Sequence, residues 1–196
     1  SSWEMENDSE VMSLTSLVIP DKVTYVGKAA FAYFNGTFHG AMIRQYSLDH
    51  TKRENYKGMT NIESLTLGKS LQTIGDFAFS GSKIKKLKLP ASLKTIGTDA
   101  FSLSWYLTDV TFTDLEHAQL QELGGFQQCF VLKHVDVPTT VTNIGEAAFS
   151  ECGKLKNIAL PPSLKSVGFQ AFSSAVIGDV NGVFSLPEGT ETIDRY

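Results

Sequence analysis

The sequence predicts a solenoid, in which the chain winds as a right-handed superhelix of coils of about 23 residues each. One apolar pattern recurs along the chain, with copies that start at residues 14, 62, 84, 107, 132 and 155. The last five starts are separated by 22, 23, 25 and 23 residues. A glycine and a phenylalanine also recur at fixed places within the copies. Recurrence this regular is typical of stacked repeat units.

The first part of each copy predicts a short β-strand. Its residues follow the order apolar-x-x-apolar-x-apolar and are followed by proline or glycine, as at 84–90, 132–138 and 155–161. The alternation over the last three apolar positions is that of a strand with one buried face. Proline cannot extend a backbone ladder, so it ends the strand. Because each coil contributes one such strand, we expect a parallel sheet.

The second part of each copy predicts another extended piece, a glycine turn and a short helical or 3-10 turn that carries an Ala-Phe pair. We expect the glycine to take a positive φ, and the last copy has Asp194 in its place. The recurring glycines are Gly27, Gly75, Gly97, Gly124, Gly145 and Gly168. The recurring phenylalanines, expected to form one interior column, are Phe31, Phe79, Phe101, Phe149 and Phe172.

The repeats predict a single solenoid domain over residues 14–196, preceded at 1–13 by a cap or a disordered segment. The first two starts are 48 residues apart, about two periods, so residues 38–61 are either a degenerate repeat or an insertion. In the fourth copy the glycine and phenylalanine are shifted and the alanine is missing, so its turn is not predicted. The last repeat, 181–196, is incomplete, and we expect a monomeric fragment of a longer chain.

Composition excludes several classes of protein. With 42% hydrophobic and 19% charged residues, the chain can fold around a core, which a disordered protein cannot. Its net charge of −4 is not that of a nucleic-acid-binding domain. No run of about 18 apolar residues predicts a transmembrane segment. Two cysteines are too few for a disulfide scaffold.

The repeat resembles that of a known family. The pattern Leu/Ile-x-x-Leu-x-Leu-Pro-x-x-Leu-x-x-Ile-Gly-x-x-Ala-Phe-x-x-Cys is best kept from Leu132 to Cys152. It is similar to the BspA-like leucine-rich repeats of bacterial surface proteins, and the resemblance covers about residues 14–194. It implies a leucine-rich-repeat solenoid that is secreted or exposed at the cell surface. It also implies adhesion to a protein or glycan ligand, including ligands derived from a host.

Cys129 and Cys152 follow their phenylalanines by three residues, at a position that holds Ser82, Ser104 and Ala175 in other copies. Because this position favours small residues, we expect it to face the core. Neighbouring coils would bring the two Cα atoms about 5 Å apart, within reach of a disulfide. The alternatives are this disulfide and a pair of buried thiols, and we favour the thiols.

Outward side chains of the predicted strands form rows across the sheet, and lysines gather in these rows. One interpretation is a basic patch that holds an acidic partner such as an anionic glycan. The other is a solvated face on which lysines prevent aggregation, since the face has no aromatic side chains for stacking on sugars. The candidate residues are Lys85, Lys86, Lys88, Lys133, His134 and Lys156.

Two further segments are candidates for binding. Residues 44–57 are the most polar interruption of the repeats, and Arg44 and Arg53 are candidate binding residues within them. Insertions in solenoids often map to binding faces, although a decayed repeat would look the same. Trp105 and Tyr106 precede a predicted strand, where they would either anchor a partner or fill the core.

The sequence has no catalytic signature: no nucleophile elbow, zinc-binding histidine pair, P-loop or dinucleotide motif occurs. The only hint of paired carboxylates is Asp109 and Asp136, on adjacent predicted coils. We predict a non-enzymatic binding or adhesion module, extracellular or at the cell surface, without cofactor, metal or nucleic-acid partner. The alternatives are a structural spacer or scaffold segment of a larger surface protein, and an enzyme of the β-helix lyase kind.

Overall fold

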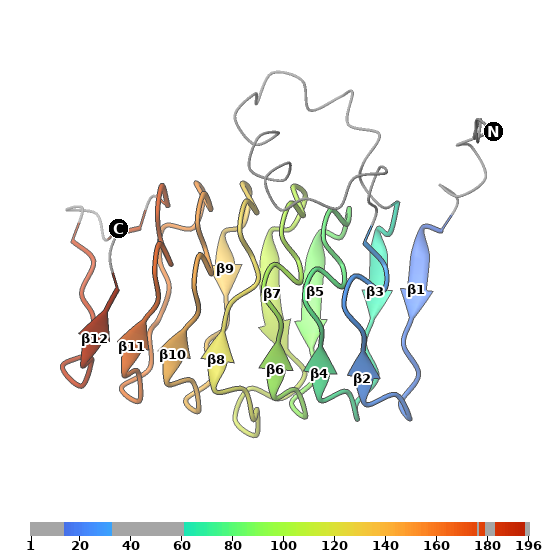
Figure 1. Ribbon diagram of the computed structural model, residues 1–196, viewed down its shortest axis with the longest axis horizontal. Helices are drawn as coiled ribbons and strands as arrows, with labels where there is room; N and C mark the ends of the chain where they lie inside the picture. The colour runs from blue at the N-terminus through green and yellow to red at the C-terminus, as the bar shows by residue number, and fades with distance from the viewer. Residues whose placement is uncertain (1–13, 33–60, 176, 179–182, 195–196) are drawn as a thin grey trace, which may run out of the picture.

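The computed structural model describes residues 14–32, 61–175, 177–178 and 183–194, and its coils lie side by side along one axis, with β1 and β12 at opposite ends (Figure 1). Most coils contribute a main strand and, after a bend, a second strand. The main strands are β1 (Ser16–Val18), β3 (Ser64–Thr66), β5 (Lys86–Leu89), β7 (Asp109–Phe112) and β9 (His134–Val135). The second strands are β2 (Tyr25–Val26), β4 (Thr73–Ile74), β6 (Thr95–Ile96), β8 (Glu122–Leu123), β10 (Asn143–Ile144), β11 (Ser166–Val167) and β12 (Thr192–Ile193).

The described strands pair in parallel with their counterparts in the neighbouring coils. On the main side, β1 pairs with β3, and β5, β7 and β9 form one sheet in which Lys86, Asp109 and His134 lie side by side. On the other side the orders are β2-β4-β6 and β12-β11-β10-β8. This arrangement confirms the predicted parallel solenoid with coils about 23 residues apart.

The first coil stacks directly on the coil that begins at residue 62. Leu17 pairs with Leu65 between β1 and β3, and Val26 pairs with Ile74 between β2 and β4. This register leaves no place in the stack for a coil between them. Residues 38–60 themselves, like the predicted segment 1–13, lie outside the described residues.

A column of phenylalanine rings runs through the core, as the repeat predicts. Neighbouring rings are nearly parallel, with centroids 5.4 to 5.9 Å apart, a spacing at which aromatic pairs attract. Phe126 of the irregular fourth copy joins the column, and Phe184 ends it by meeting Phe172 edge-on at 5.4 Å. The stacked rings are those of Phe31, Phe79, Phe101, Phe126, Phe149 and Phe172.

The recurring glycines differ from the prediction, because none of the six takes a positive φ. Close approach between coils is the reason for glycine at several of these positions. A Cβ on Gly75 would lie 2.6 Å from the backbone nitrogen of Lys28, and one on Gly97 would lie 2.4 Å from that of Asp76. A backbone atom cannot swing aside as a side chain can. Glycine therefore lets successive coils stack at this bend.

The expected helical turn is a run of β-turns in the described residues. In the coil that begins at residue 62, the N–H of Ala78 donates to the carbonyl of Gly75 at 3.2 Å. The third residue of this turn, Phe77, has a φ of 57°, and Gly81 has a φ of 73° in a later turn. Left-handed residues interrupt a right-handed helix and suit type II turns. Non-glycine residues take positive φ at the equivalent positions elsewhere: Ala29, Asp99, Leu103, Gln128, Ala147, Glu151, Gln170 and Ser174.

The shortened fourth copy keeps its place in the stack through Gly125. One residue separates Gly124 from Phe126, whereas three separate Gly97 from Phe101. Gly125 takes a φ of 88°, and its carbonyl accepts a hydrogen bond of 2.8 Å from the N–H of Phe101, where other coils use alanine. A Cβ on Gly125 would lie 3.0 Å from the carbonyl oxygen of Gly97. Glycine is thus required here both by φ and by space.

In the described residues both sides of the solenoid have interrupted ladders, at different junctions, and the main ladder ends at β9. On the main side β3 and β5 do not pair with each other, while β4 and β6 of the same coils do. On the other side β6 and β8 do not pair with each other, while β5 and β7 of the same coils do. Every junction between described coils therefore keeps at least one ladder.

Candidate binding face

The outward side chains of the main strands carry most of the predicted binding residues. We call this surface the lysine face. Its rows are joined through Thr108, whose N–H donates to the carbonyl of Lys85 at 2.8 Å and whose carbonyl accepts from the N–H of Lys133 at 2.9 Å. Lys156 lies in the coil after β9. The lysine face consists of Lys85, Lys86, Lys88, Lys133, His134 and Lys156, all exposed.

Strand alternation fixes which side chains point outward. Along β5 the exposed Lys86 and Lys88 alternate with Leu87 and Leu89, which are buried. Successive residues of a strand point to opposite faces. A shift of one residue would bury two ammonium groups, so the hydrophobic core sets the register of the lysines.

The lysine–carboxylate pairs of the described residues lie elsewhere. Lys69 pairs with Asp21 of the neighbouring coil at 3.3 Å, and Lys165 pairs with Glu191 at 2.9 Å. In the described part of the chain, no ion pair involves a lysine of the lysine face. The ammonium groups of this face are therefore available to an external anion.

The two aspartates among these lysines have local partners. The hydroxyl of Thr108 donates to Asp109 Oδ2 at 2.6 Å, and His134 Nε2 lies 3.0 Å from Asp136 Oδ1. Asp109 of β7 pairs with His134 of β9, whereas Asp136 lies two residues after His134 along the chain. The side chain of Asp136 is 24% exposed and that of His134 is 55% exposed. The geometry therefore gives two separate carboxylates, and the basic groups extend further into solvent.

An aromatic edge borders the lysine face. Trp105 and Phe130 belong to neighbouring coils, and their ring centroids are 6.1 Å apart with planes at 44°. Tyr106 is 49% exposed and precedes Thr108 by two residues. We call Trp105, Tyr106 and Phe130 the aromatic edge. Sequence reasoning missed Phe130, although it follows Cys129 as Trp105 follows Ser104, and this shared position was the available signal.

The predicted site residues Arg44 and Arg53 lie outside the described residues. The lysine face is therefore described without them.

Both cysteines are free, buried thiols. The Sγ of Cys129 donates to the carbonyl of Phe101 at 3.3 Å, and that of Cys152 donates to the carbonyl of Phe126 at 3.3 Å. Burial raises the pKa of Cys129 well above its usual value and that of Cys152 to about 12. The structure thus has the buried thiols that we favoured over the disulfide, and they line the core.

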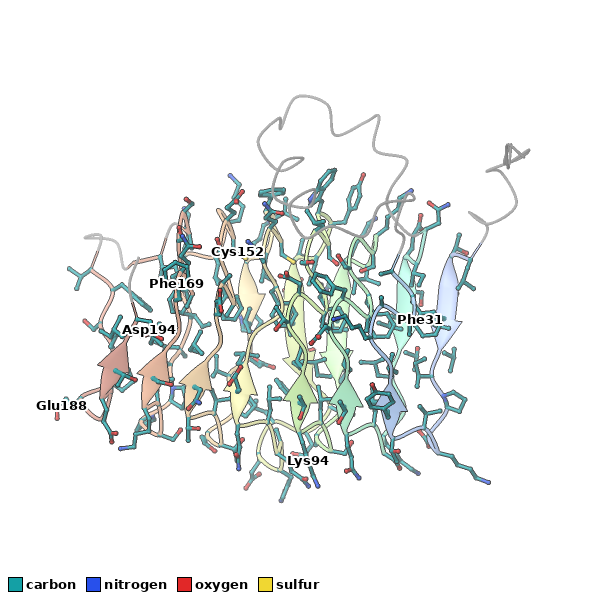
Figure 2. The ribbon with its side chains drawn as sticks, in the orientation of Figure 1. Phe31, Lys94, Cys152, Phe169, Glu188 and Asp194 are labelled. Atoms are coloured by element: carbon teal, nitrogen blue, oxygen red, sulfur yellow. The ribbon has the colours of Figure 1, made fainter. Side chains whose placement is uncertain are left out.

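The concave features of the molecule are shallow grooves at the bends. One, of about 610 Å³, lies beside the interruption between β6 and β8. In Figure 2 its residue Lys94 lies at the lower edge of the stack, away from Cys152. The groove is lined by Lys94, Thr95, Ala118, Gln119, Gln121 and Thr140.

No metal-binding cluster is found in the described ranges 14–32, 61–175, 177–178 and 183–194. Within them, no three histidine, cysteine, aspartate or glutamate side chains gather in a way that could hold a metal ion. The same residues include no helix with the length and apolarity needed to cross a bilayer.

Comparison with known families gives a match over most of the chain. Residues 9–115 and 122–196 match, in six copies, the family described as BspA type leucine-rich repeat region. A search of curated proteins gives no significant match.

Solved structures with a similar fold include two bacterial leucine-rich repeat proteins. A leucine-rich repeat protein from Bacteroides ovatus has 21% sequence identity and a TM-score of 0.61, with 91% of this chain and 45% of that chain covered. One from Eubacterium ventriosum has 20% identity and a TM-score of 0.53, with 89% and 45% covered. The chain thus spans less than half the length of these proteins. At this identity the likeness shows the fold alone.

Proposed function

Because this chain belongs to the BspA-type leucine-rich repeat family, we propose that it is a non-enzymatic recognition module of a bacterial surface protein. In this proposal it acts outside the cell and binds a protein or glycan, including partners of host origin, through the lysine face. Arg44 and Arg53 are proposed as additional contacts on the basis of sequence.

One observation supports this role most strongly. Five exposed lysines lie on one face without ion pairs in the described residues, while Lys28, Lys69 and Lys165 on other surfaces pair with carboxylates of neighbouring coils. A face that only needed to remain soluble would be served equally by mixed charges. Unpaired like charges repel, and an external anion would relieve this repulsion.

The alternative role is a structural spacer within a longer surface protein. The continuous stacking of the phenylalanine column favours it, because such an array sets a fixed distance between its ends. A spacer has no ligand, and its lysines would serve only to keep the sheet from aggregating.

A binding screen separates the two roles. We expect the purified protein to bind at least one member of an array of host-surface proteins and glycans with a Kd well below millimolar. The variant K85E/K86E/K133E should lose this binding, and the variant K22E/K94E/K165E, with the same change in net charge on other surfaces, should keep it. Binding that survives in both variants would move the site off the lysine face, and no binding at all would support the spacer.

A further inference from the structure

We propose that the lysine face and the aromatic edge form one site for an acidic polysaccharide strand that lies across the main strands. This inference rests on the recognition role proposed above and names its ligand class. It stands on two independent features: the spacing of unpaired lysines, and aromatic rings at the border of the same face.

The lysines are spaced for a linear polyanion. Neighbouring strands are about 4.8 Å apart, so Lys85 and Lys133, which flank Thr108 through backbone hydrogen bonds, are separated by about two strand spacings. Lys156 continues the series in the next coil. A chain that runs along the solenoid axis therefore meets lysines in the coils that begin at residues 84, 132 and 155, on both sides of the coil of Thr108, which suits an extended polyanion. A small anion would need convergent groups, which this face does not have.

The acidic side chains do not oppose such a ligand. Asp109 accepts a hydrogen bond from the hydroxyl of Thr108, and Asp136 lies beside His134. The side chain of Asp136 is less exposed than that of His134. The positive groups are thus the ones that a polymer on the surface of the sheet would reach first.

The aromatic edge makes a sugar a better ligand than other polyanions. Tyr106 is half-exposed and precedes Thr108 by two residues, at the end of the coil that carries Lys85. The rings of Trp105 and Phe130 meet across the two neighbouring coils, with centroids 6.1 Å apart. A tyrosine presents an apolar ring and a polar hydroxyl. Sugar rings offer C–H faces for the ring and hydroxyl groups for hydrogen bonds, whereas an acidic polypeptide offers no such faces.

Titration calorimetry on the intact chain tests the proposal with four probes. Dextran sulfate and polygalacturonate are the sulfated and the carboxylated polysaccharide, dextran is the neutral one, and poly-L-glutamate is a polyanion without sugar. We expect binding to one or both acidic polysaccharides, weakened by salt because the charges are exposed, and none to dextran. Whichever of the two binds more tightly identifies the anionic group.

Paired variants locate the site. K86Q/K88Q should weaken polysaccharide binding by about fivefold or more, while K22Q/K94Q, with the same loss of charge elsewhere, should not. Y106S should weaken polysaccharide binding about fivefold and leave binding to poly-L-glutamate unchanged. The control is Y25S, because Tyr25 is 61% exposed on the opposite side. All six substituted positions are exposed, so circular dichroism should show unchanged folding.

The outcomes separate this inference from the proposed function. Equal binding to poly-L-glutamate and polysaccharides, with no effect of Y106S, would overturn the inference and leave only a general basic surface. Failure to bind any acidic polysaccharide would also overturn it. In that case a protein partner found in the earlier screen, lost in K85E/K86E/K133E, would keep the recognition role.

Discussion

Phe101 and Phe126 stack with ring centroids 5.5 Å apart and planes at 7°, although their coils have turns of different length. The coil of Phe126 has one residue between its glycine and its phenylalanine, and the coil of Phe101 has three. The core position of the ring is thus kept while the turn that leads to it changes. We infer that the phenylalanine column, more than the turn sequence, defines a coil of this protein.

Replacing a ring in the column should cost much stability. Phe101 is fully buried, so F101A should lower the free energy of unfolding by about 3–5 kcal/mol, through lost burial and the cavity left behind. Urea unfolding followed by circular dichroism measures this difference. The control is F169A, because Phe169 is a phenylalanine of the repeats that lies outside the column and is 39% exposed. F169A should lower the free energy of unfolding by less than about 1.5 kcal/mol. Equal losses in the two variants would show that the column is not the core.

Alanine should be tolerated at one recurring glycine and not at another. A Cβ on Gly97 would lie 2.4 Å from the backbone nitrogen of Asp76, so G97A must push two coils apart and should cost about 2 kcal/mol or more. On Gly27 the nearest atom would lie at 3.7 Å, an ordinary contact, and G27A should change stability by about 0.5 kcal/mol or less. Thermal unfolding of both variants measures the contrast. If both destabilise equally, backbone conformation and not close approach explains these glycines.

The buried thiols should make stability fall at alkaline pH. In the unfolded chain both cysteines ionise near the ordinary pKa of 9.0, whereas burial raises the pKa of Cys152 to about 12 and that of Cys129 well above the ordinary value. Above pH 9 the unfolded state therefore binds fewer protons than the folded state, and stability decreases as pH rises. Between pH 8 and pH 10 the wild type should lose about 2–3 kcal/mol more than C129A/C152A.

Alanine suits this control because Ala175 occupies the same position in another copy. The free energy of unfolding at the two pH values is measured by urea titration. Parallel losses in the wild type and in C129A/C152A would contradict the prediction, since other groups would then cause the alkaline loss.

A serine at the bend joins two coils. The hydroxyl of Ser163 lies 2.7 Å from the carbonyl oxygens of both Thr139 and Val141 in the preceding coil. S163A should lower the free energy of unfolding by about 1–2 kcal/mol, because carbonyl groups lose their donor. S64A, on an exposed outward position of β3, is the control and should be nearly neutral. A loss in S163A no larger than that in S64A would mean that water replaces the hydroxyl without cost.

The repeat allowed the coil, its parallel strands and the phenylalanine column to be predicted, because each follows from apolar side chains that must face one interior. The same reasoning assigned positive φ to the glycines, where the structure has it two residues later, at positions such as Phe77 and Asp99. A recurring glycine indicates that a side chain is not tolerated at that position. It does not indicate whether the side chain is excluded by a positive φ or by contact with a neighbouring coil. Only the stack of coils shows that Asp76 lies against Gly97.

The candidate site was predictable in part. Alternation along the strands placed Lys86 and Lys88 outward, and the repeat register placed Asp109 beside His134, as observed. The contact between Trp105 and Phe130 was not foreseen, because the two residues occupy a position between two recurring features of the pattern and meet only across coils. The sequence also did not predict which lysines lack ion pairs, since pairing depends on the direction of long side chains in neighbouring coils.

The alternating interruptions of the two ladders give the molecule a mechanical character. A pull along the axis meets one intact row of hydrogen bonds at every junction, but around residues 84–123 the intact row changes from one side to the other. The two junctions on either side of the coil that begins at residue 84 would therefore bend in opposite directions. Each would open on the side where its ladder is interrupted. The stacked rings of Phe79, Phe101 and Phe126 connect the coils across both junctions.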